Sequence, residues 1–233
     1  MADKIAVIVG AGSGLSASLA RRFATAGFAV ALAARNTDKL AGLVRETKAK
    51  AYPCDASEAA EVDALFEGVA RDFGTPDVVV FNASRRARGP IAELDPAEVK
   101  AAILTSAYGG FLVGRKAAQL MVPAGRGTIF FTGASAGVKG FPLSAPFAMG
   151  KFGLRGLAQS MARELHPQNI HVVHVVVDGG IANPERSGRM GNERGPDGML
   201  DPDAIAETYY QLHAQHRSAW SWEIEVRPWV EKF

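Results

Sequence analysis

The chain has 233 residues, of which 48% are hydrophobic and 21% are charged, which is ordinary for one globular domain. Lys and Arg number 26 against 24 Asp and Glu, so the formal charge of +2 gives no electrostatic case for binding nucleic acid or a membrane surface. Cys54 is the single cysteine, which excludes an intrachain disulfide and favours a reducing compartment. No signal-peptide pattern and no apolar run near the ~18 residues of a membrane helix is visible, so we expect a cytoplasmic protein.

Short apolar segments alternate with longer amphipathic segments along the chain. The apolar segments are nearly continuous hydrophobic runs, which is typical of strands that helices cover on both faces. These predicted strands are Ile5–Val9, Phe28–Ala34, Asp77–Phe81, Thr128–Thr132 and Ile170–Val177. Asp95-Pro96 and Asp201-Pro202 each place an acidic N-cap before a proline, which predicts two helix starts. The alternation predicts a doubly wound α/β fold, with a parallel sheet inside one domain spanning residues 1–233.

Two segments near the carboxyl terminus depart from this alternation. Residues 178–200 contain six glycines and two prolines, which is typical of either a lid over a substrate or a solvated loop. The tail over residues 218–233 contains Trp220, Trp222 and Trp229, and we expect it to form a final strand whose aromatic side chains are buried.

A glycine-rich turn follows the first predicted strand and opens a helix. Glycine allows the backbone to turn tightly and to approach a pyrophosphate, which then lies at the helix N-terminus. The context of strand, turn and helix favours dinucleotide binding over a turn kept only for packing. The expected phosphate-binding residues are Gly10, Gly12, Ser13, Gly14 and Leu15.

The end of the second predicted strand favours NADP over NAD. An acidic residue there would bind the ribose hydroxyls of NAD, but this chain has Ala34 followed by Arg35. A guanidinium at this position can bind the 2′-phosphate of NADP. The alternative is that Arg35 is a solvated surface residue.

The spacing Gly10-x-x-x-Gly14-x-Ser16 resembles the TGxxxGxG signature of the short-chain dehydrogenase/reductase family, with Ser16 in place of the last glycine. Three further segments are similar to family motifs, in the expected order. Asp55-Ala56 resembles the segment that contacts adenine, Asn82-Ala83-Ser84 resembles the NNAG motif, and Asp178-Gly179-Gly180-Ile181 resembles the PG motif. The resemblance implies that these segments contact the cofactor, with the backbone of Ile181 near the nicotinamide carboxamide and Gly179 in the same turn.

The catalytic residues that the resemblance implies are largely replaced. The family uses a tyrosine four residues before a lysine, so that the two share one helix face. Lys151 is present, but Phe147 occupies the tyrosine position. Ala134 occupies the serine position, and Ser106 occupies the position of the asparagine that supports a proton relay. Because a positioned general acid contributes about 10²–10⁴ in rate, we expect carbonyl reduction by the family mechanism to be badly impaired.

Three interpretations remain open. The chain is an oxidoreductase that reduces an activated C=C bond with a non-standard proton donor, or a catalytically inactive NADP-binding sensor or partner subunit, or an enzyme rescued by another residue such as Tyr108. Ser144 lies seven residues before Lys151, where enoyl reductases place their tyrosine, but it also has the position of a helix N-cap. Tyr108 is also a candidate for helix packing or an interface.

Three arginines follow the fourth predicted strand, at the sheet edge where such folds bind ligands. Arg85, Arg86 and Arg88 can clamp an anionic small-molecule substrate, or they can belong to a solvated basic loop. His171 and His174 fit core positions better than metal ligation. The resemblance also implies a homodimer or homotetramer, in which Gly109, Gly110 and Gly114 would allow helices of two subunits to approach closely.

Overall fold

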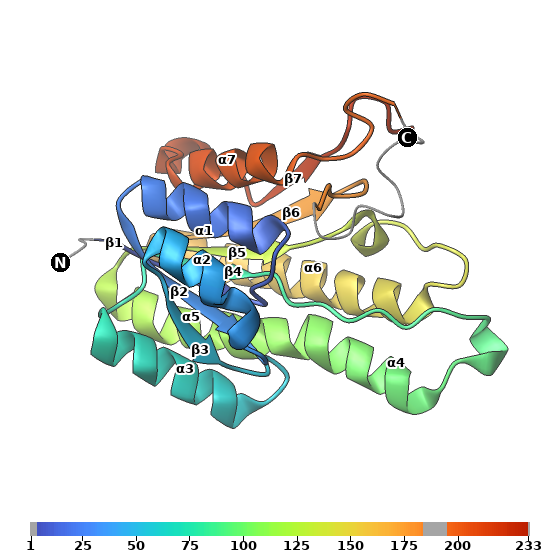
Figure 1. Ribbon diagram of the computed structural model, residues 1–233, viewed down its shortest axis with the longest axis horizontal. Helices are drawn as coiled ribbons and strands as arrows, with labels where there is room; N and C mark the ends of the chain where they lie inside the picture. The colour runs from blue at the N-terminus through green and yellow to red at the C-terminus, as the bar shows by residue number, and fades with distance from the viewer. Residues whose placement is uncertain (1–3, 184–194, 233) are drawn as a thin grey trace.

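Seven strands form one parallel sheet in the order β3-β2-β1-β4-β5-β6-β7 (Figure 1). The structure is a computed structural model, and it describes residues 4–183 and 195–232. The strands are β1 (Lys4–Val9), β2 (Phe28–Ala34), β3 (Lys50–Pro53), β4 (Val78–Phe81), β5 (Gly127–Thr132), β6 (Ile170–Val177) and β7 (Glu223–Val226). This arrangement confirms the predicted doubly wound α/β fold.

Helices cover both faces of the sheet (Figure 1). One layer contains α1 (Leu15–Thr25), α2 (Ala41–Thr47) and α7 (Pro202–His213), and the other contains α3 (Ala59–Asp72), α5 (Gly109–Ala124) and α6 (Ala145–Leu165). The helix α4 (Pro96–Ile103) continues into α5 through a π-helical turn, η3 (Leu104–Tyr108). Short 3₁₀ turns are η1 (Asp38–Leu40), η2 (Ile91–Glu93), η4 (Ser135–Gly137), η5 (His166–Gln168) and η7 (Arg217–Ala219).

The strand sequences explain the two-sided core. Every residue of β6 is buried, because the two helix layers enclose it, and this includes His171 and His174. The predicted helix starts are confirmed, since Asp95 accepts a hydrogen bond from the Ala97 amide and Asp201 accepts one from the Asp203 amide. None of the helices in the described part of the chain is both long enough and apolar enough to cross a membrane.

Three expectations need correction. The fourth strand begins at Val78 rather than Asp77, and the Asp77 carboxylate accepts hydrogen bonds from the Ile5 amide and from Arg126. Trp229 is 80% exposed, because it follows the last strand and lies outside both helix layers. The glycines of α5 serve packing within the chain: a methyl group on Gly114 would lie 2.9 Å from Phe131 Cζ.

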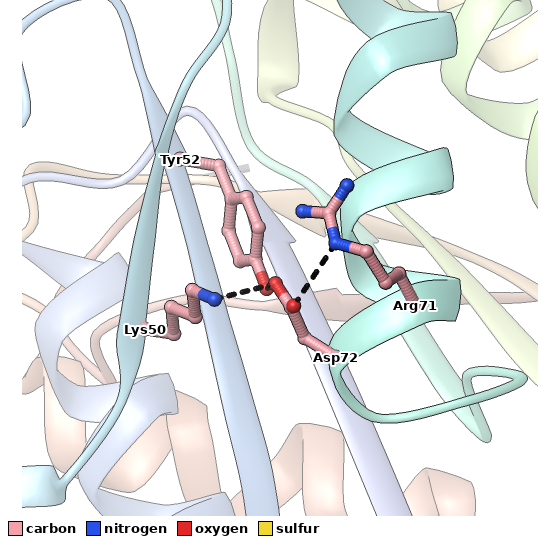
Figure 2. Close-up of polar contacts among 4 residues, drawn as sticks. All are labelled: Lys50, Tyr52, Arg71 and Asp72. Atoms are coloured by element: carbon pink, nitrogen blue, oxygen red, sulfur yellow. Dashed lines mark hydrogen bonds and ion pairs between the residues drawn. The ribbon is translucent and has the colours of Figure 1, made fainter.

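A polar cluster ties β3 to α3 at the end of the sheet away from the strand carboxyl ends (Figure 2). Asp72 accepts hydrogen bonds from Lys50 Nζ (2.6 Å) and from the Tyr52 hydroxyl (2.7 Å), and its carboxylate also contacts Arg71 (3.3 Å). The bonds from Lys50 and Tyr52 lower the pKa of Asp72 to about 2. The carboxylate is therefore fully engaged in holding the edge strand.

Candidate functional site

The residues expected to form the site come together at the carboxyl ends of the parallel strands. The turn after β1 lies between the segments that follow β2 and β4, where the strand order reverses direction. Open α/β sheets bind ligands in the crevice at such a point. The fold therefore groups segments that are widely separated in the sequence.

The turn after β1 needs glycine at its first position. Gly10 has φ +85°, and a methyl group there would lie 2.6 Å from the Cα atom of Ala83. The amides of Gly10 and Ala11 both donate to the Ala33 carbonyl oxygen, at 3.0 and 2.9 Å, which fixes the turn against the end of β2.

The same turn leaves room for a ligand. A Cβ atom added at Gly12 would meet nothing within 4 Å, and the N-cap residue of α1, Gly14, has no side chain that could block or cap the helix end. Ser13 lies between these glycines, and Leu15 begins the helix. An uncapped helix N-terminus beside open space is suited to an anion, so the turn fits a pyrophosphate.

The serine that replaces the last family glycine makes a contact that the sequence did not suggest. Ser16 is 2% exposed, and its hydroxyl donates to the Gly10 carbonyl oxygen (3.0 Å) and accepts from Asn82 Nδ2 (2.7 Å). The backbone amide of Asn82 also donates to the Val9 carbonyl oxygen (2.8 Å). Asn82 and Ala83 therefore lie directly beside the glycine turn, and the exposed Ser84 follows them in the chain.

Arg35 lies on the surface immediately after β2 and close to the segment that follows β3. Burial alone would raise the pKa of the Asp55 carboxyl, but hydrogen bonds from Ser57 and the charges of Arg35 and Arg85 lower it overall. Ala56 is buried, and its carbonyl oxygen would lie 2.8 Å from a methyl group on Gly109. Arg35 and Asp55 thus occupy the same end of the crevice.

Lys151 is 3% exposed, and its Nζ donates to the carbonyl oxygen of Thr132, the last residue of β5, across 2.6 Å. Burial, followed by the charge of Arg86, lowers the Lys151 pKa to about 7. The lysine therefore exchanges its proton near neutral pH.

The position one helical turn before Lys151 is apolar. Phe147 is 7% exposed and forms a small buried cluster with Ala134 and Ala136. Neither Phe147 nor Ala134 carries a hydroxyl group, so these two side chains offer no proton and no hydrogen bond to a substrate oxygen.

The two candidate serines occupy different environments. Ser106 lies in the π-helical turn η3 and is fully buried, and its hydroxyl accepts from the Arg85 amide at 3.4 Å. It packs closely on α6, since a methyl group on Gly150 would lie 2.8 Å from Ser106 Cβ. Ser144 precedes α6 at the predicted N-cap position, but its side chain makes no capping hydrogen bond.

The segment after β6 places Gly179 against Pro228 in the tail and pairs Ile181 with Leu200. The Leu200 amide donates to the Gly180 carbonyl oxygen at 2.8 Å, so the two ends of the 178–200 segment lie together. Residues 184–194, the middle part of the predicted lid, lie outside the described residues.

Asp178, which stands where the family has proline, forms ion pairs with Arg227 (3.2 Å) and Lys139 (3.7 Å). Sequence reasoning missed these pairs. The only sign of them in the sequence was an acidic residue at the position of a family proline, and it did not identify the cation with which that residue pairs.

The three arginines after β4 have different surroundings. Arg85 donates to both carboxylate oxygens of Glu98 at 2.8 Å, Arg86 lies over the Phe147 ring, and Arg88 is exposed. Tyr108 is 41% exposed and stacks on Phe111, with the ring centroids 6.0 Å apart.

Comparison with known proteins agrees with this arrangement. Residues 4–187 match the family model described as short chain dehydrogenase. A short-chain dehydrogenase from Rhodopseudomonas palustris is 36% identical, with a TM-score of 0.84 over 97% of this chain and 99% of that chain. A metagenomic short-chain oxidoreductase in complex with NADP is 31% identical, with a TM-score of 0.84 over 97% of each chain.

A curated relative extends the comparison to an enzyme of named activity. The trans-4-hydroxycyclohexanecarboxylate dehydrogenase of Sinomonas cyclohexanicum is 31% identical over 199 residues, which are 81% of this chain and 76% of that protein. The chain therefore belongs to the short-chain dehydrogenase/reductase family of oxidoreductases.

Proposed function

We propose that this chain is an NADP-dependent reductase that acts on a C=C bond conjugated to a carbonyl group of a small molecule, without the phenol that its family uses. The observation that carries the proposal is that the crevice keeps its cofactor-binding residues but has no side-chain hydroxyl at the tyrosine and serine positions of the family. The turn at Gly10 and the buried Lys151 are intact, whereas Phe147 and Ala134 supply no proton donor.

NADP fits the residues that line the crevice. The turn residues Gly10, Gly12, Ser13, Gly14 and Leu15 would hold the pyrophosphate, and Arg35 would hold the 2′-phosphate. The adenine would lie by Asp55 and Ala56, and the nicotinamide half by Asn82, Ala83, Ser84, Lys151, Gly179 and Ile181. The NADP complex of the metagenomic relative supports this choice over NAD. When bound in its reduced form, this cofactor supplies a hydride.

Reduction of a conjugated C=C bond suits a site without a phenol. Hydride adds to the β-carbon, the π-electron pair moves to the carbonyl oxygen, and the resulting enolate takes a proton at its α-carbon. Hydrogen-bond donors and charge can stabilise that enolate without transferring a proton to it. Lys151, with a pKa of about 7, can release a proton at neutral pH, and we propose Ser106 and Ser144 as the hydroxyl groups that complete a relay.

Matched substrates test the reaction. We expect the wild type to oxidise NADPH in the presence of 2-cyclohexen-1-one and to leave cyclohexanone unreduced. Phe147→Tyr restores the phenol and should add cyclohexanone reduction. Robust cyclohexanone reduction by the wild type would contradict the assignment of Phe147.

Calorimetric titration with NADP and NAD tests the cofactor. If neither binds, the proposal is wrong from its first step. If NADP binds but no substrate supports NADPH oxidation, the chain is a catalytically inactive cofactor-binding protein. The absence of a hydroxyl group from both Phe147 and Ala134 is compatible with that alternative.

We also propose that the protein assembles as a homodimer or homotetramer through α5 and α6. Four large apolar or aromatic side chains on these helices and on η3 are at least 41% exposed. They are Tyr108, Phe111, Met149 and Phe152. Light scattering coupled to size exclusion would give the mass, and a monomer at micromolar concentration would contradict the assembly. Met149→Glu with Phe152→Glu should shift the mass toward the monomer.

A further inference from the structure

A cavity lies at the end of the sheet opposite the cofactor crevice. It measures about 540 Å³, and its walls come from the segment just before β6 and the segment just before β7. These two strands are parallel neighbours, so the cavity lies at their amino ends, whereas the crevice lies at the carboxyl ends of the strands. Sites for small organic molecules commonly measure ~300–1,000 Å³, so the cavity is large enough to hold one.

His166, in the turn η5, lines this cavity with a ring whose tautomer is set by the backbone. Its Nε2 atom lies 3.1 Å from both the amide nitrogen and the carbonyl oxygen of Val172. The amide hydrogen is fixed and directed at Nε2, so a second hydrogen on that nitrogen would face it. The neutral ring therefore accepts from the amide and carries its proton on Nδ1. Among the described residues, Nδ1 has no hydrogen-bond partner, so it can donate to a ligand.

His216 lines the cavity from the other segment, and its ring is oriented in the same manner. Its Nδ1 atom accepts from the Ser218 amide at 3.4 Å and lies 2.8 Å from the Ser218 hydroxyl, which can donate to it. An acceptor at Nδ1 places the proton of the neutral ring on Nε2. Within the part of the chain that the structure describes, this Nε2 has no partner. The cavity thus has a second imidazole donor.

Arg217 adds a permanent positive charge to the two imidazole donors. Its side chain is exposed, and it forms no ion pair with any described residue. None of the described residues that line the cavity is acidic, so the charge is not balanced from within. N–H donors on three side chains, one of them a guanidinium, form a set that suits an anion.

The rest of the cavity wall is largely apolar. The ring of Trp220 stacks on the buried ring of His171, with centroids 4.6 Å apart and an angle of 2° between the planes. The indole N–H donates to the Gln215 carbonyl oxygen at 3.2 Å, so the ring is held from two directions. Pro167 and Ala219 also line the cavity. A lone inorganic anion would leave this surface uncovered, whereas an organic group would cover it.

We propose that this cavity binds a phosphate monoester, with the phosphate group on His166, His216 and Arg217 and the organic group against Trp220. A phosphate monoester has three terminal oxygens, which matches three separate donors, whereas a carboxylate has two. The inference concerns binding alone and does not depend on the proposed reduction of a C=C bond.

Calorimetric titration of the whole chain with phenyl phosphate tests the site. Arg217→Gln should weaken binding by about tenfold or more, because it removes a charged donor. His216→Asn keeps an acceptor for the Ser218 amide but lacks the Nε2 donor, and His166→Gln keeps one for the Val172 amide but lacks the Nδ1 donor. Each should weaken binding several-fold. Arg163→Gln removes an exposed cation of α6 outside the cavity and should bind as the wild type does.

The cofactor crevice also suits phosphate groups, so the titration is repeated with NADP in excess. The affinity for phenyl phosphate should stay the same, and displacement of the probe by NADP would overturn the assignment. Equal losses in Arg163→Gln and Arg217→Gln would overturn it in favour of diffuse charge. So would unchanged binding in Arg217→Gln, which replaces an exposed side chain and should fold normally.

Two further ligands test the chemistry of the cavity. Benzoate keeps the ring but has a carboxylate, and inorganic phosphate lacks the ring, so both should bind more weakly than phenyl phosphate. Benzoate of equal affinity would overturn the choice of phosphate, and inorganic phosphate of equal affinity would overturn the role of Trp220. Phenyl phosphate that gives neither heat nor broadening of its phosphorus NMR resonance at millimolar concentration would overturn the whole inference.

Discussion

Asn82 donates a hydrogen bond to the Ser16 hydroxyl across 2.7 Å, and this hydroxyl donates in turn to the Gly10 carbonyl oxygen. The pair joins the segment after β4 to the glycine turn after β1. Because Ser16 is 2% exposed, water cannot replace the lost partner in Ser16→Ala. We predict that this change lowers the free energy of unfolding by about 1–2 kcal/mol and weakens NADP binding several-fold. Urea denaturation and calorimetry measure the two effects.

The matched control is Ser18→Ala. Ser18 is 4% exposed on the same helix, and its substitution removes a hydroxyl without touching the bond between Asn82 and Ser16. Equal losses of NADP affinity in the two variants would show that the link between the two segments has no role in binding.

Lys151 should make the stability of the cofactor-free protein depend on pH. Burial and the charge of Arg86 lower its pKa from 10.5 to about 7. Between these values the unfolded chain holds a proton that the folded chain has released, so the free energy of unfolding rises with pH. Relative to Lys151→Met, we predict that the wild type gains up to about 1.4 kcal/mol per pH unit between about pH 7 and pH 9.

Urea denaturation of the two proteins at stepped pH values measures this difference. Cys54 and the tyrosines also titrate at alkaline pH, but they are present in both proteins and cancel in the comparison. Parallel stability curves for the wild type and Lys151→Met would show that the lysine keeps an ordinary pKa when the protein folds.

The fold could be predicted because apolar runs in the sequence identify its buried strands. Phe28–Ala34 is a continuous apolar run, and Ile170–Val177 is nearly so apart from its two histidines, a pattern that is typical of strands buried on both faces. The edge strand β3 could not be bounded in this way, since Lys50 and Pro53 interrupt its apolar character. The π-helical turn η3 was also missed, because no local pattern distinguishes it from the α-helices on either side.

The backbone of the site was more predictable than its side-chain contacts. Motif spacing located the turn at Gly10 and the helix position of Lys151, because a few consecutive residues determine those geometries. The contact between Arg86 and Phe147 depends instead on how the segment after β4 crosses the start of α6. Sequence spacing carries no information about such a crossing, so the three neighbouring arginines looked equivalent until the structure separated them.

Arg35 should control the choice of cofactor. It is exposed immediately after β2, and its charge reaches Asp55 in the same end of the crevice. A charge-assisted hydrogen bond contributes about 1.5–3 kcal/mol, so we predict that Arg35→Ala weakens NADP binding by about tenfold or more and leaves NAD binding unchanged. Arg45→Ala removes an exposed cation from α2 and serves as the control. A ratio of NADP to NAD affinities that is the same in Arg35→Ala and the wild type would make Arg35 a solvated surface residue.

Asp178 should anchor the tail to the segment after β6. Its side chain is 7% exposed and contacts Arg227 at 3.2 Å, while its amide donates to the Val226 carbonyl oxygen at 2.9 Å. Asp178→Asn removes only the charge, and we predict a loss of about 1.5–3 kcal/mol in the free energy of unfolding. Asp178→Pro restores the residue that is usual in the family, yet it should cost more, because proline also removes the amide donor.

Urea denaturation measures the order of these losses in the free energy of unfolding. The comparison holds where the variants share the wild type's dependence of that free energy on urea concentration. Asp38→Asn, at an exposed position in η1, is the control and should change stability by no more than about 0.5 kcal/mol. If Asp178→Pro were as stable as the wild type, the ion pair and the hydrogen bond would both be dispensable, and the tail would have to be held by the contact between Pro228 and Gly179 instead.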